Sequence, residues 1–495
     1  MLLLLTAYLA VAILFAAWLP AWQAPDEPAH YNYIHELVIT GQFPVMRMGD
    51  YDEAYLERLT TERFPPQLSI ASVRYEGHQP PLYYLLGTLP FSLSRGSLLA
   101  VRLLSVGLGA LFVLLIYAIV RLIFPNRAAW ALGAAGFTAF LPMHVAMAAA
   151  VNNDALAEVL LAAILWLSIR YVKLGLLGPP PPSRMDALAL GAVAGLALIT
   201  KVSAYVGIPV ALAAPLIVWF ECQRTEGVKR LPFSALALIA LPALLMALPW
   251  YVRNAQVYGN LDILGRHWHD AVVVGQLRTS ELIAQAGLLA TLERFLVWSH
   301  DSFWGVFGWM GAWLDSRVYS VLLGFSLATL AGSAVAARDM RARMVAPQPV
   351  ARFQRWALAL LGLAALGTLG IYLTYNLIFV QPQGRYLFPA LPAISLAVAV
   401  GWWMVTQRAS AARRAAFWLL AALVVAIAWG VTHEGINRWS VLIFAGAAAA
   451  LLAWSWLNAR LPRWLAAAAF ALPFALLPLL NLYALFAVIV PQLAR

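Results

Sequence analysis

The feature that most constrains this chain is a series of apolar segments, each about as long as a bilayer-crossing helix. Such a helix needs about 20 mostly apolar residues. Thirteen stretches meet or approach that length: 2–20, 98–120, 128–149, 155–172, 186–200, 203–220, 232–251, 318–337, 356–379, 386–406, 415–431, 439–458 and 464–490. Because only helices and closed barrels satisfy their backbone polar groups in lipid, we predict an all-α polytopic membrane protein with about 13 transmembrane helices.

The composition excludes a soluble globular protein. Of 495 residues, 63% are hydrophobic and 11% are charged, and the mean hydropathy is +0.78, whereas a soluble domain carries about 25% charged residues. A net charge of +11 would suggest nucleic acid in a soluble protein. Basic cytoplasmic loops produce the same excess in a membrane protein, so we expect membrane lipids and no nucleic acid as partners.

Lysine and arginine concentrate in alternate short loops, and this pattern predicts the orientation of the chain. If these loops are cytoplasmic, the N-terminus is cytoplasmic and the C-terminus lies outside. The first segment lacks a basic n-region and a small-x-small cleavage site, which favours a retained helix over a signal peptide. We expect a multi-pass protein of the cytoplasmic (inner) membrane, with two long extracytoplasmic loops, 21–97 and 252–317, that carry interfacial helices.

Two adjacent carboxylates, Asp26 and Glu27, directly follow the first apolar segment. Neighbouring acids repel each other, so one carboxyl has a raised pKa or a cation binds both. The structural alternative is that Asp26 caps a surface helix through 31–40, with Pro28 in its first turn. The pair lies where a membrane-embedded substrate would meet water, and this position favours a functional role.

The first long loop closes with the motif E-G-H-Q-P-P-L-Y-Y, which contains Glu76, His78 and Gln79. Glu76 and His78 are acid–base groups or cation ligands, and a divalent cation held by Glu27, His30, Glu76 and His78 is one hypothesis. The alternative is a turn that leads into an interfacial aromatic belt.

Polar residues also interrupt the apolar segments. Asn153 and Asp154 precede the fourth segment, either as helix caps or as contacts to a substrate. Lys201 lies between two segments. A charge so close to the hydrocarbon is a functional candidate, and snorkelling to the interface is its alternative.

Two arginines border the predicted outer loops. Arg253 lies in W-Y-x-R-N, which opens the second long loop, and Arg385 and Tyr386 lie in Q-G-R-Y-L-F-P-A-L-P. A guanidinium binds phosphate through its fixed fork of donors, while anchoring at lipid headgroups is the alternative. An arginine on the outer side opposes the charge rule, so Arg385 is the better phosphate candidate.

In this order, the motifs resemble those of the C-type-fold (GT-C) polyprenyl-phosphate-sugar-dependent glycosyltransferases. They are most similar to the protein O-mannosyltransferase and aminoarabinose transferase group. The resemblance covers residues 1–405 as a catalytic module, and the last three predicted helices, within 406–495, carry no matching motif.

The resemblance implies sugar transfer from a polyprenyl-phosphate donor to a hydroxyl of a glycan, lipid or protein on the outer face of the membrane. Asp26 would be the general base of an inverting reaction, and Glu27 would position the acceptor or a cation. The expected substrate- and phosphate-binding residues are Arg253, Arg385, Tyr386, Lys201, His78, Gln79, Asn153 and Asp154. A lysine expected near His78 is absent, because Gly77, His78 and Gln79 stand there.

Two other functions compete with this interpretation. A transporter or flippase of polyprenyl-linked sugars would need ionisable groups inside the helices, facing a cavity, whereas most acids here lie in loops. A lipid-sugar polymerase or ligase without the C-type fold would place its key arginine and histidine in a large late loop, and no such loop follows residue 405.

Overall fold

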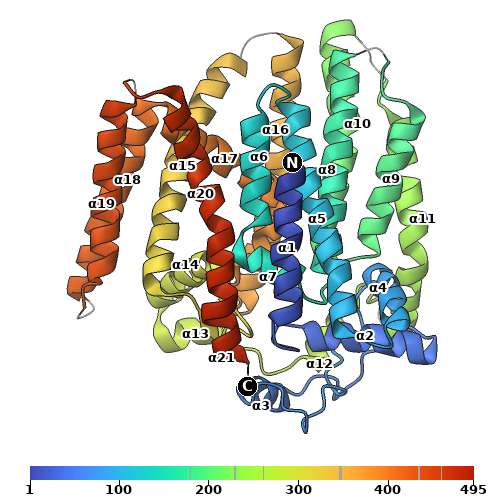
Figure 1. The fold of residues 1–495 in the computed structure, drawn as a ribbon. Coiled ribbons are helices and arrows are strands. Elements are labelled where there is room, and N and C mark those ends of the chain that lie inside the picture. Colours follow the sequence, from blue (N-terminus) through green and yellow to red (C-terminus); the bar gives the residue numbers. More distant parts are fainter. Residues whose placement is uncertain are drawn as a thin grey trace.

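The computed structural model describes residues 1–178, 180–227, 230–259, 261–344, 348–432, 435–458 and 460–494. Its long helices run side by side in one bundle, and the shorter helices gather at one end (Figure 1). Apart from a two-stranded hairpin, β1 (Val306–Phe307) with β2 (Ala312–Trp313), and one isolated bridge, the regular structure of the described residues is helical. The predicted all-α membrane fold is confirmed.

Ten helical segments within the described residues are long and apolar enough to cross a membrane. They are α5 (Leu98–Ile123), α8 (Asp154–Leu177), η1 with α10 (Val202–Val206 and Gly207–Glu226), α11 (Phe233–Tyr258), α15 (Ser316–Met344), α16 (Pro349–Ile378), η2 with α17 (Gly384–Ala390 and Leu391–Gln407), α18 (Ala409–Thr432), α19 (Arg438–Leu457), and α20 with η3 and α21 (Arg463–Tyr483, Ala484–Ile489 and Val490–Leu493).

The predicted count of thirteen is not confirmed, although a helix lies at each of the thirteen predicted segments. The third segment is broken into α6 (Ala128–Ala139) and α7 (Pro142–Ala148), which are bent by 64° and make an eleventh span if counted together. Proline at the start of α7 cannot continue the hydrogen-bond ladder of α6. Helices α1 (Leu2–Trp18) and α9 (Arg184–Leu198) have 17 and 15 residues, which is short for a bilayer crossing.

The N-terminus lies partway along the bundle, whereas the C-terminus lies at its lower end, where both long loops gather (Figure 1). The first loop contains α2 (Glu27–Thr40), α3 (Glu53–Thr61) and α4 (Leu82–Leu93), and the second contains α12 (Arg266–Val272), α13 (Thr279–Ala286) and α14 (Leu288–Gly305). The guanidinium of Arg63 donates to the carbonyl oxygen of Ala494 at 2.7 Å, so the first loop contacts the end of the chain.

Helix α8 lies at the centre of the bundle, where it packs against α5, α9, α10 and α16. Of the residues in its most apolar 18-residue window, 78% are buried, compared with 11% for α19 at the periphery. The N-terminal end of this enclosed helix, at Asp154, lies on the wall of the cavity described below. The division of the chain at residue 405 stays a prediction.

Candidate active site

A cavity of about 980 Å³ lies at the loop-bearing end of the bundle. Its walls come from the first loop, the start of α8, the junction of α9 and α10, helices α12, α14 and α16, and the segment η2. This volume is at the upper end of the range for small-molecule sites. Of the predicted residues, eight line it: Asp26, Glu76, His78, Gln79, Asp154, Lys201, Arg385 and Tyr386.

Asp26 occupies the N-cap position of α2, as the structural alternative predicted, but its side chain does not cap the helix. Its backbone is in the left-handed region, with φ of 68°, which is uncommon for a residue other than glycine. The carboxylate instead accepts a hydrogen bond from the hydroxyl of Tyr75 at 2.8 Å and one from Arg385 at 3.0 Å. The chain is therefore held in a strained conformation that aims the carboxylate into the cavity.

Opposing influences act on the pKa of Asp26. Burial alone would raise it, but Arg385, His30, the hydroxyl of Tyr75 and Lys201 together outweigh burial and lower it. An ionised carboxylate that accepts hydrogen bonds from charged donors keeps its charge at neutral pH. Asp26 is therefore available as a proton acceptor.

Glu76 and His78 lie in the same cavity and respond differently to it. Burial raises the pKa of Glu76 to about 7, with a further contribution from the charge of Asp26. One of its carboxylate oxygens, Oε2, has no hydrogen-bond partner among the residues that the structure describes. Burial lowers the pKa of His78 to about 3, and the neighbouring His269 adds to this effect. The two carboxyls, Asp26 and Glu76, thus have pKa values that are shifted apart, as in sites where one group accepts a proton and another holds one.

Glu27 does not reach the cavity, which disagrees with the role expected for it as a contact to the acceptor or a cation. Its carboxylate is fully buried and accepts two hydrogen bonds from Arg102 on α5, at 2.7 and 2.6 Å. The backbone amides of Trp22 and Val151 also donate to it, each at 3.1 Å. Arg102 in turn donates to carbonyl oxygens at the end of α1. Glu27 therefore joins α1, α2, α5 and the 150–151 turn.

The four proposed metal ligands are not brought together. Glu76 and His78 line the cavity, whereas Glu27 is bound to Arg102 and His30 is buried, with its Nδ1 atom 2.9 Å from the hydroxyl of Tyr84. Across the described ranges, no group of three or more His, Cys, Asp or Glu side chains is arranged to hold a metal ion. This disagrees with the hypothesis of a cation site built from these four residues.

Asp154 and Lys201 form an ion pair on the cavity wall, 2.8 Å apart. Asp154 is the first residue of α8, and Asn153, not Asp154, holds the N-cap position. Asn153 is fully buried behind the wall, where its amide donates to Gln79 at 3.4 Å. Asn153 therefore supports a lining residue and does not itself face the cavity.

Arg253 lies outside the cavity lining, so its expected phosphate contact stays a prediction that this position does not support. Its guanidinium donates to the carbonyl oxygens of Phe43 and Pro44, at 3.3 and 2.5 Å, and lies 4.7 Å from the ring centre of Trp250. Arg253 thereby holds residues 43 and 44 of the first loop against α11.

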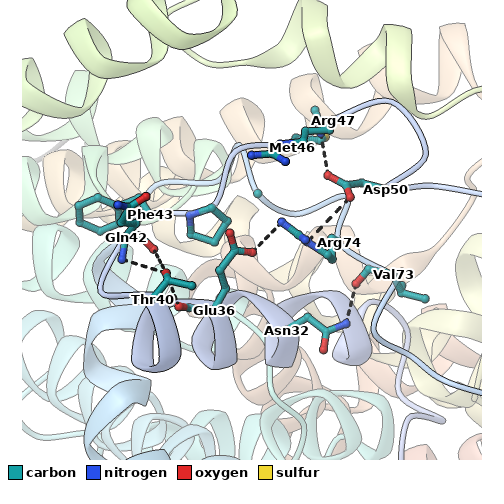
Figure 2. Close-up of polar contacts among 12 residues, drawn as sticks. Asn32, Glu36, Thr40, Gln42, Phe43, Met46, Arg47, Asp50, Val73 and Arg74 are labelled. Atoms are coloured by element: carbon teal, nitrogen blue, oxygen red, sulfur yellow. Dashed lines mark hydrogen bonds and ion pairs between the residues drawn. The ribbon is translucent and has the colours of Figure 1, made fainter.

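A second set of polar contacts holds the later part of the first loop, around residues 73 and 74, against α2 in the same loop (Figure 2). Arg74 pairs with Glu36 at 2.7 Å and lies 3.8 Å from a carboxylate oxygen of Asp50. Asn32 donates to the carbonyl oxygen of Val73 at 2.9 Å. These contacts hold the residues directly before Tyr75 and Glu76 against α2, whose N-cap is Asp26, and so fix the distance between the three groups.

Several cavity residues were missed in the sequence. They are Tyr75, Arg266, Asp270, Arg294, Trp298, Tyr372, Tyr375 and Gln383. The run of charged and imidazole groups at 266–270, inside a predicted outer loop, is the signal that would have indicated some of them. Arg294 and Trp298 are one turn apart on α14, with the guanidinium 4.3 Å from the ring centre. An amphipathic helix with this spacing is a common surface feature, so the pattern alone does not indicate a site.

Comparison with known proteins agrees with the resemblance seen in the motifs. The family model for dolichyl-phosphate-mannose-protein mannosyltransferase matches residues 78–250, less than half of the chain. This range contains the H-Q-P-P-L-Y-Y and N-N-D motifs but neither Asp26 nor Arg385. No curated protein sequence matches the chain.

Solved structures of the same general fold exist. ArnT from Cupriavidus metallidurans bound to undecaprenyl phosphate is similar with a TM-score of 0.52 and 16% sequence identity, over 99% of this chain and 77% of ArnT. The apo state of ArnT gives a TM-score of 0.51 with the same identity and coverage. At this identity the likeness shows the fold, and it confirms the predicted GT-C-like architecture.

Proposed function

We propose that this protein is a membrane glycosyltransferase that moves a sugar from a polyprenyl-phosphate donor to an acceptor hydroxyl. The family model and the ArnT-like fold support this class of enzyme. The observation that carries the proposal is the pairing of Asp26 with Arg385 in the cavity wall, at 3.0 Å. The pairing supports the proposal because a carboxylate can accept a proton and a guanidinium can bind phosphate.

The reaction needs a base and a stabilised leaving group. Asp26 takes the proton from the acceptor hydroxyl as its oxygen attacks the anomeric carbon, which inverts that centre. The bond between the anomeric carbon and the phosphate oxygen breaks, and the electron pair leaves with the polyprenyl phosphate. Positive charge must lie where this negative charge develops. Arg385, Lys201, Arg266 and Arg294 are the lysine and arginine residues that line the described cavity.

The lipid part of the donor needs an apolar path beside the cavity. Gly367, Gly370 and Thr374 of α16 lie on the cavity wall, as do Val202 and Trp250 of the neighbouring spans. A carbon atom added to Gly370 would meet no atom of the described residues within 4 Å, so the space beside Gly370 is open, whereas one added to Gly367 would lie 2.8 Å from the side chain of Val206. We assign the polyprenyl tail to this path between α16 and the α10–α11 side of the bundle.

The cavity residues belong to the loop-bearing end of the bundle, and the end of α5 and the starts of α6 and α9 lie at the opposite end (Figure 1). Arg121 lies in the last turn of α5, Arg127 is the N-cap of α6, and Arg184 is the first residue of α9. Since basic loops stay in the cytoplasm, the proposed orientation places the site on the extracytoplasmic face of the inner membrane. The acceptor hydroxyl then belongs to a glycan, a lipid or a protein outside the cytoplasm.

The transporter alternative has less support. Its requirement is an ionisable group inside the bundle that faces a cavity. The buried pair His144 and Glu158, 3.0 Å apart, lies within the bundle, but neither residue lines the cavity. Ionisable groups that do line it, such as Asp154 and Arg385, lie in the first turn of their spanning segments and not in the middle.

Transfer of labelled sugar from polyprenyl-phosphate-linked donors, with the purified protein in nanodiscs, tests the proposal. Asp26→Asn should lower the rate by about 10²- to 10⁴-fold, the usual contribution of a general base. Asp186→Asn is the matched control, because Asp186 lies in the capping box of α9 and should retain activity. A folded Asp26→Asn protein that still transfers sugar would show that Asp26 is not the base. Movement of labelled lipid without a new glycosidic bond would favour transport.

A further inference from the structure

Arg385 divides its hydrogen bonds among three partners around the cavity. Its Nε atom donates to the side-chain oxygen of Gln383 at 2.7 Å, and Nη2 donates to Asp26 at 3.0 Å. Nη1 lies 3.8 Å from the sulfur of Met147, which is a weak acceptor. In this structure, therefore, the strongest acceptor for the guanidinium is the proposed base itself.

This arrangement weakens Asp26 as a base. Both of its carboxylate oxygens accept hydrogen bonds, Oδ1 from Tyr75 and Oδ2 from Arg385. Burial is the largest single influence on the pKa of Asp26 and raises it. The charge of Arg385 is the second largest influence and lowers that pKa. A carboxylate with a lowered pKa has less affinity for the proton of an acceptor hydroxyl.

We propose that Asp26 and the phosphate of the lipid-linked donor share Arg385, so that binding of the donor loosens the guanidinium from Asp26 and activates the base. This inference rests on the proposed function, because it takes the donor phosphate to lie beside Arg385. It makes Arg385 the link between donor binding and proton removal: without donor, the base is held in an ion pair.

The contacts indicate which group stays in place. Asp26 is fixed by its backbone at the start of α2 and by the hydroxyl of Tyr75. Arg385 has a long side chain, and its anchor Gln383 is itself held by the side chain of Gln381, at 2.7 Å. These three side chains, Gln381, Gln383 and Arg385, all line the cavity. The guanidinium can therefore turn toward a phosphate while the carboxylate keeps its position.

The chemistry of the leaving group strengthens the effect along the reaction. The donor is a phosphodiester with one negative charge, and the released polyprenyl phosphate gains a second charge as the glycosidic bond breaks. The attraction of Arg385 to the phosphate therefore grows toward the transition state, which is where an interaction accelerates the reaction. The base becomes stronger at the same stage.

A binding cycle with undecaprenyl phosphate tests the sharing without measuring activity. Asp26→Asn removes the competing carboxylate, so affinity for undecaprenyl phosphate should rise by roughly three- to tenfold, the range for breaking a partly exposed ion pair. Arg385→Gln should weaken binding. In the double variant, Asp26→Asn should no longer increase affinity, because its effect depends on the freed guanidinium.

Two controls complete the cycle. Undecaprenol has the same tail without the phosphate, so Asp26→Asn should not change its affinity. Asp154→Asn removes a carboxylate that pairs with Lys201 and not with Arg385. Any gain that Asp154→Asn gives in affinity for undecaprenyl phosphate should therefore persist in the Arg385→Gln background.

Three outcomes would overturn the inference. Unchanged or weaker binding by Asp26→Asn shows that the carboxylate does not compete for Arg385. If Asp26→Asn still increases the affinity for undecaprenyl phosphate in the Arg385→Gln background, the cause is simple charge repulsion between the carboxylate and the phosphate. If the wild-type protein binds undecaprenyl phosphate no better than undecaprenol, the proposed donor itself is wrong, and Arg385 is then not shared between Asp26 and a donor phosphate.

Discussion

Arg102 on α5 donates to both carboxylate oxygens of Glu27, in surroundings that leave the two side chains 3% and 0% exposed. A buried ion pair of this kind is costly to break, because the remaining partner is left charged and unpaired away from water. The pair that the sequence presents as Asp26 and Glu27 is thus divided between two tasks. One carboxylate faces the cavity and the other holds the helices that form it.

Glu27→Gln should destabilise the protein while leaving the groups in the cavity unchanged. We expect a loss of about 3–5 kcal/mol, the usual cost of removing one partner of a buried pair, measured by unfolding in detergent. Glu36→Gln on the same helix is the control. Its pair with Arg74 is a quarter to a third exposed (Figure 2), so the loss should stay below about 1 kcal/mol. Equal stability of the two variants would contradict the structural role of Glu27.

The different tasks of Asp26 and Glu27 could not be predicted from the sequence. The two residues are adjacent, and their partners lie far away: Arg102 follows Glu27 by 75 residues and Arg385 follows Asp26 by 359 residues. Arg102 also lies inside a long apolar segment, where a sequence pattern gives no indication of its partner. Long-range packing, which hydropathy does not encode, decides which carboxylate is buried.

The helical bundle itself was predictable because lipid imposes a simple rule on length and polarity. The segments that depart from this rule could not be predicted in the same way. The bend between α6 and α7 follows from Pro142, whereas α9 ends at Leu198, three residues before Lys201, whose ion pair with Asp154 the sequence showed only as an isolated charge. Arg253 and Arg385 show the same limit, since both border outer loops and only one reaches the cavity.

Glu76 should make the stability of the protein depend on pH near neutrality. Its pKa is raised to about 7 in the folded protein, so between its ordinary value and about 7 the folded state binds more protons than the unfolded state. Stability should therefore fall as the pH rises through this window. Glu76→Gln has no proton to lose, and its unfolding temperature should fall less steeply between pH 5 and pH 8 than that of the wild type, as measured by thermal unfolding in detergent.

The controls for Glu76 address the other groups around it. Asp26, Lys201, His269 and Gln79 all influence its pKa, and each keeps its identity in Glu76→Gln. Glu53→Gln, at another part of the cavity, should leave the pH dependence of the wild type unchanged. Identical pH dependence of the wild type and Glu76→Gln would show that Glu76 does not titrate in this range.

Lys201 and Arg253 should differ in their effect on the donor, although the sequence presents both as outer cations. Lys201 lines the cavity and Arg253 does not, so Lys201→Gln should weaken binding of undecaprenyl phosphate by about tenfold or more, the value of one charged hydrogen bond. Arg253→Gln should change that affinity by less than about twofold and should instead loosen the first loop, where Arg253 holds Phe43 and Pro44. Limited proteolysis of the first loop measures the second effect. A tenfold weaker affinity in Arg253→Gln would place it at the phosphate.

Gly370 offers a test of the path for the lipid tail. It lines the cavity on α16, and a carbon atom added there would meet no protein atom within 4 Å. Gly370→Leu therefore fits the folded protein, and replacing glycine within a helix favours the helix by up to about 1 kcal/mol, so lost activity would not come from unfolding. The added side chain should occupy the space of the polyprenyl tail, raising the KM for a long-chain donor more than for a short-chain donor. Gly362→Leu is the matched control, because Gly362 lies on the same helix with equally open surroundings and outside the cavity lining. Equal KM changes for both chain lengths would show that the tail follows another route.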